Sequence, residues 1–89
     1  MKAILTVIGK DRVGIIAGIS SELQQLNINI LDVTQTIMQG YFTMIMMLDL
    51  NNISCDFDKV KKALLSKGQA LGVDVKIQRE EIFNSMHTI

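Results

Sequence analysis

The segment Ile28–Leu50, INILDVTQTIMQGYFTMIMMLDL, decides the fold of this chain. It holds two extended runs rich in β-branched and apolar residues, joined at Gln39-Gly40 by a connection so short that an antiparallel hairpin is predicted. The apolar positions change phase near Leu31, which predicts a β-bulge there. The second run, Tyr41–Leu50, is apolar on both alternating faces, so we expect it to be a central strand of a sheet.

A strand and a helix are predicted before this hairpin. Lys2–Ile8 is apolar on both faces, as a second central strand would be. A polar loop follows, and Asp11 is the predicted N-cap of a helix that ends at Asn27. The inward apolar positions of this helix are Ile16, Ile19, Leu23 and Leu26. Gly18 lowers the helix propensity, so its presence predicts close packing against another element.

A second helix and a last strand are predicted after the hairpin. Asp56 is the expected N-cap of an amphipathic helix, and Gly72 is the glycine just past its end. Val73–Gln78 alternates apolar and polar residues, as a half-buried strand does. The order β-α-β-β-α-β predicts an α+β ferredoxin-like sandwich, in which two helices cover one face of a four-stranded antiparallel sheet. The first and third strands would be central.

This pattern has a consequence for assembly. Because both helices cover the same face of such a sheet, Ile45 and Met47 on the other face would meet water in a lone domain. An exposed apolar sheet face is normally an interaction surface. We therefore expect a homo-oligomer, most simply a dimer, in which a second copy covers this face or extends the sheet edge.

The length of 89 residues fits one domain and leaves no room for a second. We expect residues 1–79 to form the ferredoxin-like domain and residues 80–89 to form a C-terminal tail. In this tail Ile82, Met86 and Ile89 are spaced four and three residues apart, which predicts a short C-terminal helix.

Composition argues against several classes of function. Nine Lys and Arg balance nine Asp and Glu, so the chain lacks the positive field that attracts nucleic acid or anionic membranes. Neither a targeting segment nor an apolar run of membrane-spanning length is present, so we expect a cytoplasmic protein. The single cysteine, Cys55, and single histidine, His87, provide no disulfide, zinc site or hydrolytic triad. We expect no catalytic residue, no metal and no cofactor.

One place could bind a small molecule, the junction between the first strand and the first helix. There a helix start exposes backbone N–H groups and the positive end of the helix dipole. The amides at Val13 and Gly14 could meet a carboxylate, and Asp11 could meet the ammonium group of the same zwitterion. From these residues alone simple helix capping is the favoured explanation, because every capped helix offers similar groups.

The segments Asp11–Ala17, DRVGIIA, and Asn27–Ile30, NINI, together with the order of elements, resemble an ACT domain over residues 1–79. The tail resembles that of small stand-alone ACT-domain proteins. In amino-acid-sensing members the effector lies where two domains meet, beside residues that match Asp11, the backbone near Gly14, and Asn29. The ligand-binding residues that the resemblance implies are Asp11, Arg12, Val13, Gly14 and Asn29.

The resulting hypothesis is a non-catalytic, allosteric sensor that binds a small amino acid or similar zwitterion at a subunit interface and acts in trans on a protein partner. One alternative is an acylphosphatase-like hydrolase on the same topology, which Arg12 suggests. An RNA-recognition domain, suggested by Gly40-Tyr41-Phe42, lacks the positive charge and aromatic pattern of that class. A purely structural oligomerisation domain is a further alternative.

Overall fold

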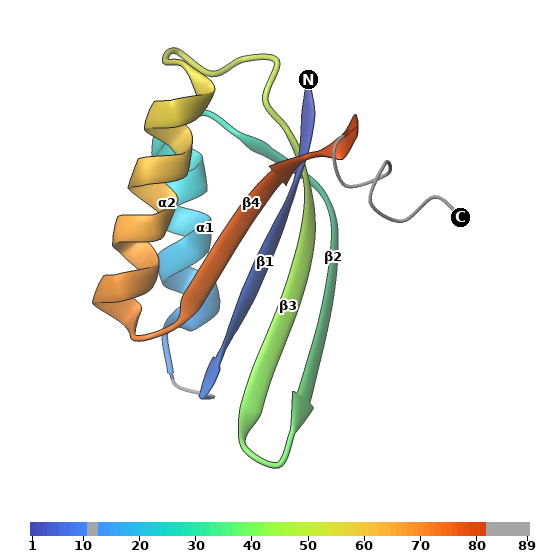
Figure 1. The fold of residues 1–89 in the computed structure, drawn as a ribbon, viewed down its shortest axis with the longest axis vertical. Helices are drawn as coiled ribbons and strands as arrows, with labels where there is room; N and C mark the ends of the chain where they lie inside the picture. The colour runs from blue at the N-terminus through green and yellow to red at the C-terminus, as the bar shows by residue number, and fades with distance from the viewer. Residues whose placement is uncertain (11–12, 82–89) are drawn as a thin grey trace.

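The computed structural model describes residues 1–10 and 13–81, which form a four-stranded sheet with two helices on one face (Figure 1). The elements are β1 (Lys2–Lys10), α1 (Ile15–Gln25), β2 (Asn29–Met38), β3 (Tyr41–Asp49), α2 (Phe57–Leu71) and β4 (Asp74–Arg79). The strand order is β2-β3-β1-β4 and every neighbouring pair is antiparallel. The predicted fold class and the central positions of β1 and β3 are confirmed.

Of the predicted C-terminal helix, the described part of the chain includes only Glu80 and Glu81, which are helical directly after β4 and are too short to form an element of their own. The element order ends with β4. Ile82, Met86 and Ile89, whose spacing predicted the helix, lie outside the described residues.

The hairpin of β2 and β3 has both features that its sequence predicted. The register shifts between Ile30 and Asp32, so the β-bulge at Leu31 is confirmed. The turn consists of Gln39 and Gly40, whose φ angles of 53° and 82° are both positive. Positive φ at both loop residues is typical of type I′ turns, whose twist matches that of the flanking strands.

The prediction for the start of α1 was wrong in two respects. The helix begins at Ile15 with Gly14 as N-cap in a left-handed conformation and without a capping side chain, so Asp11 is not the N-cap. Asp11 itself lies outside the described residues. Ile15 is buried, whereas Ile16 is 43% exposed. The reason is that adjacent isoleucines fit the helical spacing equally well, and burial follows the row Ile15, Ile19 and Leu23.

The predicted ends of α2 are confirmed. Asp56 caps the helix by accepting a hydrogen bond from the Lys59 N–H at 2.9 Å. Gly72 ends it with a φ of 75°, a conformation that glycine adopts without a Cβ penalty. The close packing expected at Gly18 is also confirmed, because a Cβ there would lie 2.9 Å from Cδ1 of Leu71 on α2.

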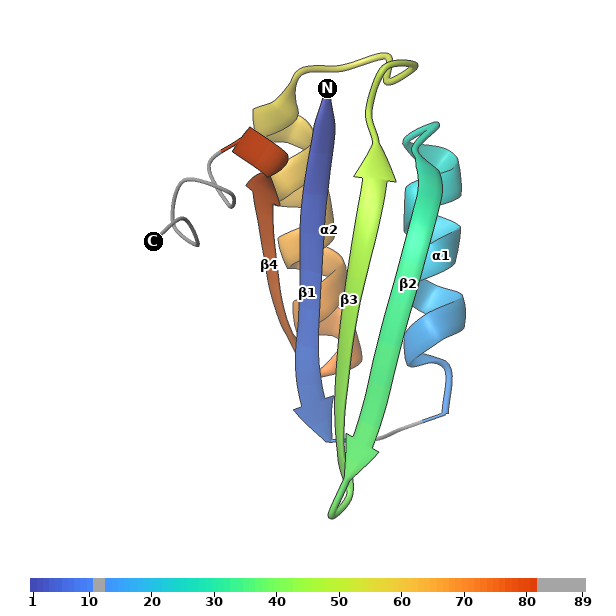
Figure 2. The same ribbon diagram turned by 90° about the vertical axis from the view of Figure 1, so that its right-hand side faces the viewer.

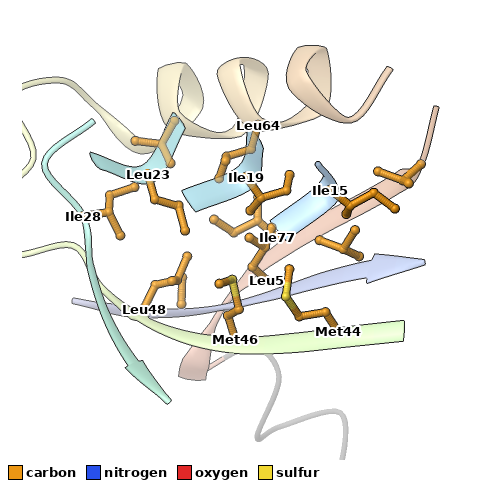
Figure 3. Packing of buried hydrophobic residues seen from close by; sticks show 14 of the residues in the cluster. Leu5, Ile15, Ile19, Leu23, Ile28, Met44, Met46, Leu48, Leu64 and Ile77 are labelled. Atoms are coloured by element: carbon orange, nitrogen blue, oxygen red, sulfur yellow. The ribbon is translucent and has the colours of Figure 1, made fainter. Parts of the chain in front are cut away.

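The hydrophobic core lies between the helices and the sheet (Figure 3). The largest fully buried side chains are Leu5, Ile15, Ile19, Leu23, Met44, Met46, Leu48, Leu64, Val7 and Val60. β3 divides its apolar residues as predicted: Met44 and Met46 enter this core, whereas Ile45 is 45% exposed on the helix-free face. Neither helix in the described part of the chain has the length and hydropathy needed to cross a membrane.

Candidate functional site

Those predicted site residues that the structure describes, Val13, Gly14 and Asn29, lie near the two ends of α1. Gly14 precedes the helix, and Asn29 follows it as the first residue of β2. The helix has 11 residues, so its ends are roughly 16 Å apart at the usual rise per residue. Figure 2 shows the two ends of α1 separated along the direction of the strands. One copy of the chain therefore does not bring Gly14 and Asn29 together.

At the start of α1 the backbone is open. Val13 is fully exposed, and a Cβ built on Gly14 would meet no atom within 4 Å. The N–H groups of residues 14–17 precede the first helical hydrogen bond, which runs from Gly18 N–H to Gly14 C=O at 2.8 Å. Ile15 is buried, so the groups available to an anion are those of Gly14, Ile16 and Ala17, which are exposed residues. Asp11 and Arg12 lie outside the described residues, so their predicted roles stay predictions.

Gly9, at the end of β1 nearest this loop, is required by packing. A Cβ on Gly9 would lie 2.7 Å from Cγ1 of Val73 and 3.2 Å from its Cα. A side chain at this position would therefore push away the segment that links α2 to β4. Gly9 keeps this end of the sheet closely packed and contributes no side chain to a ligand site.

Asn29 lines an open polar cleft beyond the C-terminal end of α1, with a volume of about 360 Å³. The polar residues of its lining are Ser20, Gln24, Asn27, Asn29 and Asn52. All five are uncharged, and all five carry a hydroxyl or an amide that can both donate and accept hydrogen bonds. Asn52 comes from the segment between β3 and α2. The sequence analysis identified only Asn29 as a ligand-binding residue among these five.

The cleft is shaped by the way α1 ends. Asn27 has a left-handed φ of 60°, and its N–H donates to the Gln24 carbonyl at 3.0 Å. The Ile28 N–H donates to the Leu23 carbonyl at 2.9 Å. This pair of bonds is a Schellman motif, with asparagine at the left-handed position. The Asn27 side chain then donates from Nδ2 to the Asn52 carbonyl oxygen at 2.8 Å, which ties the two sides of the cleft together.

An unpaired strand edge runs from this cleft. β2 is the edge strand of the sheet, and nine of its ten residues are exposed. Leu31, Val33 and Ile37 on β2 are between 43% and 57% exposed, as is Ile16 on α1. Long apolar edge strands are usually covered or paired in native proteins. The cleft and the edge are therefore neighbouring parts of one incomplete surface.

No cluster of three or more His, Cys, Asp or Glu side chains that could hold a metal ion occurs within residues 1–10 and 13–81. The chemistry available at the cleft is accordingly hydrogen bonding by neutral amides and hydroxyls.

The fold and the cleft define a ferredoxin-like α+β domain with a polar cleft beside an unpaired sheet edge. A family model described as ACT domain matches residues 2–78, so the chain belongs to the ACT domain family, as its DRVGIIA and NINI segments implied.

Relatives of the same length support this assignment. The chain is 64% identical to a UPF0237 protein of Clostridium acetobutylicum and 62% identical to one of Listeria innocua, in each case over 89 residues and the full length of both chains. It also resembles the solved structure of an ACT domain protein from Streptococcus pneumoniae, with a TM-score of 0.82 and 38% identity. That match covers 100% of this chain and 97% of the other.

Proposed function

We propose that this chain is a non-catalytic regulatory module that binds a small amino acid or a similar zwitterion between two copies of itself. Occupancy of the site would then be passed in trans to a protein partner. Membership of the ACT domain family supports a regulatory role. The observation that carries the proposal is the amide-lined cleft at Asn29, which opens beside an unpaired strand edge.

Pairing of two β2 edges would bring the separated site residues together. In an antiparallel pair related by a twofold axis, Asn29 at the start of one β2 lies beside the end of the other. That end is Met38, whose register partner is Tyr41, and Tyr41 in turn pairs with Lys10 of β1. The loop after Lys10 leads to the start of α1. The cleft of one copy and the helix start of the other would therefore share the same end of the interface.

The two ends of α1 offer opposite chemistry. The N–H groups of the exposed residues Gly14, Ile16 and Ala17 and the positive end of the helix dipole favour a carboxylate. The other end carries helix carbonyls and the side-chain amide oxygens of Gln24 and Asn29, which can accept hydrogen bonds from an ammonium group. In an antiparallel pair of α1 helices, the N-terminal end of one helix and the C-terminal end of the other would lie on opposite sides of one space between the two copies. A ligand with one carboxylate and one ammonium group fits this arrangement.

The regulatory effect would follow from linkage. A ligand that touches two copies binds their paired arrangement better than the separate chains, and so shifts the equilibrium toward the pair. Couplings of this kind are typically worth about 1–3 kcal/mol. A partner that recognises only one of the two arrangements would then respond to the concentration of the amino acid.

A thermal-shift screen of the amino acids at millimolar concentration tests the proposal, followed by calorimetry on any hit. We expect at least one amino acid to raise the melting temperature. Asn29→Ala should abolish that shift, whereas Gln69→Ala, an exposed amide on α2 outside the cleft, should retain it.

A second variant tests the requirement for two copies. Val33→Asp introduces a charge on the β2 edge outside the lining of the cleft, and it should remove both self-association through this edge and ligand binding. If no amino acid stabilises the native protein although the edge still pairs, the module serves association alone and the sensor proposal fails.

A further inference from the structure

The helix-free face of the sheet carries a second apolar surface that the cleft does not use. Figure 2 looks onto this face, with the helices behind the strands. On the two central strands, every second register pair has its side chains on this face, because side chains alternate along a strand. These pairs are Lys2 with Asp49, Ile4 with Met47, Thr6 with Ile45, Ile8 with Thr43, and Lys10 with Tyr41. The three middle pairs thus hold four apolar residues and two threonines, and the two end pairs are charged or aromatic.

The exposure of these side chains marks the surface as incomplete. Ile8, Ile45 and Tyr41 are 46%, 45% and 56% exposed. Ile4 on the same face is only 6% exposed, so other parts of the chain already cover it, and the exposed apolar side chains of the two central strands on this face are Ile8, Ile45 and Tyr41. An apolar patch that runs along two central strands is normally an interaction site.

We propose that a second copy of this chain packs on the helix-free face, with a twofold axis parallel to the strands. This contact is separate from the edge pairing of the proposed function, and either could exist without the other. A rotation about such an axis keeps each residue at its height along the strand and exchanges the two sides of the sheet. β1 of one copy therefore faces β3 of the other, with the same five residue pairs in contact across the interface.

The residues that this symmetry brings together are complementary. Lys2 faces Asp49 of the second copy, and Asp49 faces its Lys2, so two pairs of opposite charges close one end. Ile4 faces Met47, and both are apolar. At the other end Lys10 faces Tyr41, a pairing that suits a cation over an aromatic ring. Because β1 and β3 lie at the centre of the sheet, the twist of the two sheets disturbs this alignment least there.

The other twofold axis in the same plane, perpendicular to the strands, gives a poorer match. It stacks each strand on its own copy in the opposite direction. Lys2 would then face Lys10, which places like charges together, and Asp49 would face Tyr41. The pattern of residues on β1 and β3 therefore selects the parallel axis.

The size of the face indicates a reversible contact. β1 and β3 have nine residues each, β2 has ten and β4 has six, so at about 3.3 Å per residue and about 4.8 Å between strands the sheet covers roughly 540 Å². This projected area of roughly 540 Å² is below the approximately 800 Å² that each partner contributes to a typical stable interface. We expect association to depend on concentration in the micromolar range.

A charge-exchange experiment tests both the partner and the axis. Lys2→Asp leaves two acidic residues facing each other at each contact, and Asp49→Lys leaves two basic ones, so each variant alone should associate at least about tenfold more weakly. In a 1:1 mixture every acidic residue faces a basic one. Sedimentation equilibrium on each variant, the mixture and the native chain should show that mixing restores the native mass as a heteromeric species.

A matched pair of lysine substitutions tests the apolar part of the face. Ile45→Lys should weaken self-association, whereas Leu65→Lys, on α2 and 40% exposed, should leave it at the native level. Native mass in Lys2→Asp, Asp49→Lys and Ile45→Lys alike would overturn the inference, because another occupant would then cover the face. A 1:1 mixture of Lys2→Asp and Asp49→Lys that remains dissociated would also overturn the inference. Val33→Asp, which removes pairing through the β2 edge, should leave the contact on the helix-free face unchanged. This variant therefore distinguishes the two contacts.

Discussion

Gly68 of α2 lies directly against Val75 of β4, and a Cβ built on Gly68 would come within 2.5 Å of Cγ2 of Val75. It would also lie 3.1 Å from the backbone oxygen of Val73, which cannot move without disturbing the link between α2 and β4. Gly68→Ala gains up to about 1 kcal/mol in helix propensity. Overpacking typically costs about 1–3 kcal/mol, so we expect a net loss of stability in urea unfolding.

Gly18→Ala is the matched control for this prediction. A Cβ on Gly18 would lie 2.9 Å and 3.1 Å from the two δ-carbons of Leu71, which are the far end of a flexible side chain. Because Leu71 is only partly buried, it can rotate away, and the gain in helix propensity offsets the cost. Gly18→Ala should therefore have a free energy of unfolding close to the native value. Equal losses in both variants would contradict this account.

The cap of α2 supports a second prediction. Oδ1 of Asp56 accepts a hydrogen bond from the Lys59 N–H at 2.9 Å. Asp56→Ala removes this acceptor and should lower the free energy of unfolding by about 1 kcal/mol. Asp56→Ser keeps an acceptor at the same position and should recover most of the loss. Asp58→Ala, which removes a charge from the first turn without removing the cap, should cost less than Asp56→Ala when both are measured by chemical denaturation.

Adjacent methionines on β3 separate the two faces of the sheet. Met46 is 1% exposed and points into the core, whereas Met47 is half-buried on the helix-free face. Met46→Ala leaves a cavity and should cost about 2–5 kcal/mol. Met47→Ala should cost the single chain far less, but it removes an apolar contact from the proposed interface. Unfolding and sedimentation on the same two samples should therefore rank the variants in opposite orders.

The sequence predicted those features that leave a local chemical signature. Asp56 and Gly72 define the ends of α2 because a capping carboxylate and a left-handed glycine are each recognisable in one residue. The start of α1 was predicted wrongly because Gly14 caps the helix through its backbone, with no side chain to reveal it. The neighbouring Ile15 and Ile16 both fit the helical spacing, and only tertiary packing shows which of them is buried.

The polar cleft was predicted only in part for a similar reason. Asn29 was identified from the family resemblance, whereas Asn52 joins it through a fold contact. The hydrogen bond from Asn27 to Asn52 connects residues 25 positions apart. Such a contact has no period or spacing that a single sequence can reveal. The helix was predicted to end at Asn27, and it ends at Gln25 with Asn27 in the left-handed position just beyond the C-cap. The second role of Asn27, in holding the cleft, depends on the position of the segment after β3.

The β2–β3 turn supports a stabilising substitution. Gln39 has a φ of 53°, which is costly for a residue with a long side chain, and the next residue is Gly40 with a φ of 82°. Asn-Gly is strongly preferred in two-residue turns with positive φ at both positions, because asparagine tolerates the left-handed region. Gln39→Asn should therefore raise the free energy of unfolding by about 0.4–1 kcal/mol, as substitutions that favour the native backbone do elsewhere. The same change at Gln35, within β2, should give no gain, because asparagine is depleted in strands. Thermal unfolding of the two variants checks the prediction. Equal melting temperatures for Gln39→Asn and Gln35→Asn would show that the positive φ at Gln39 does not lower the stability of the native protein.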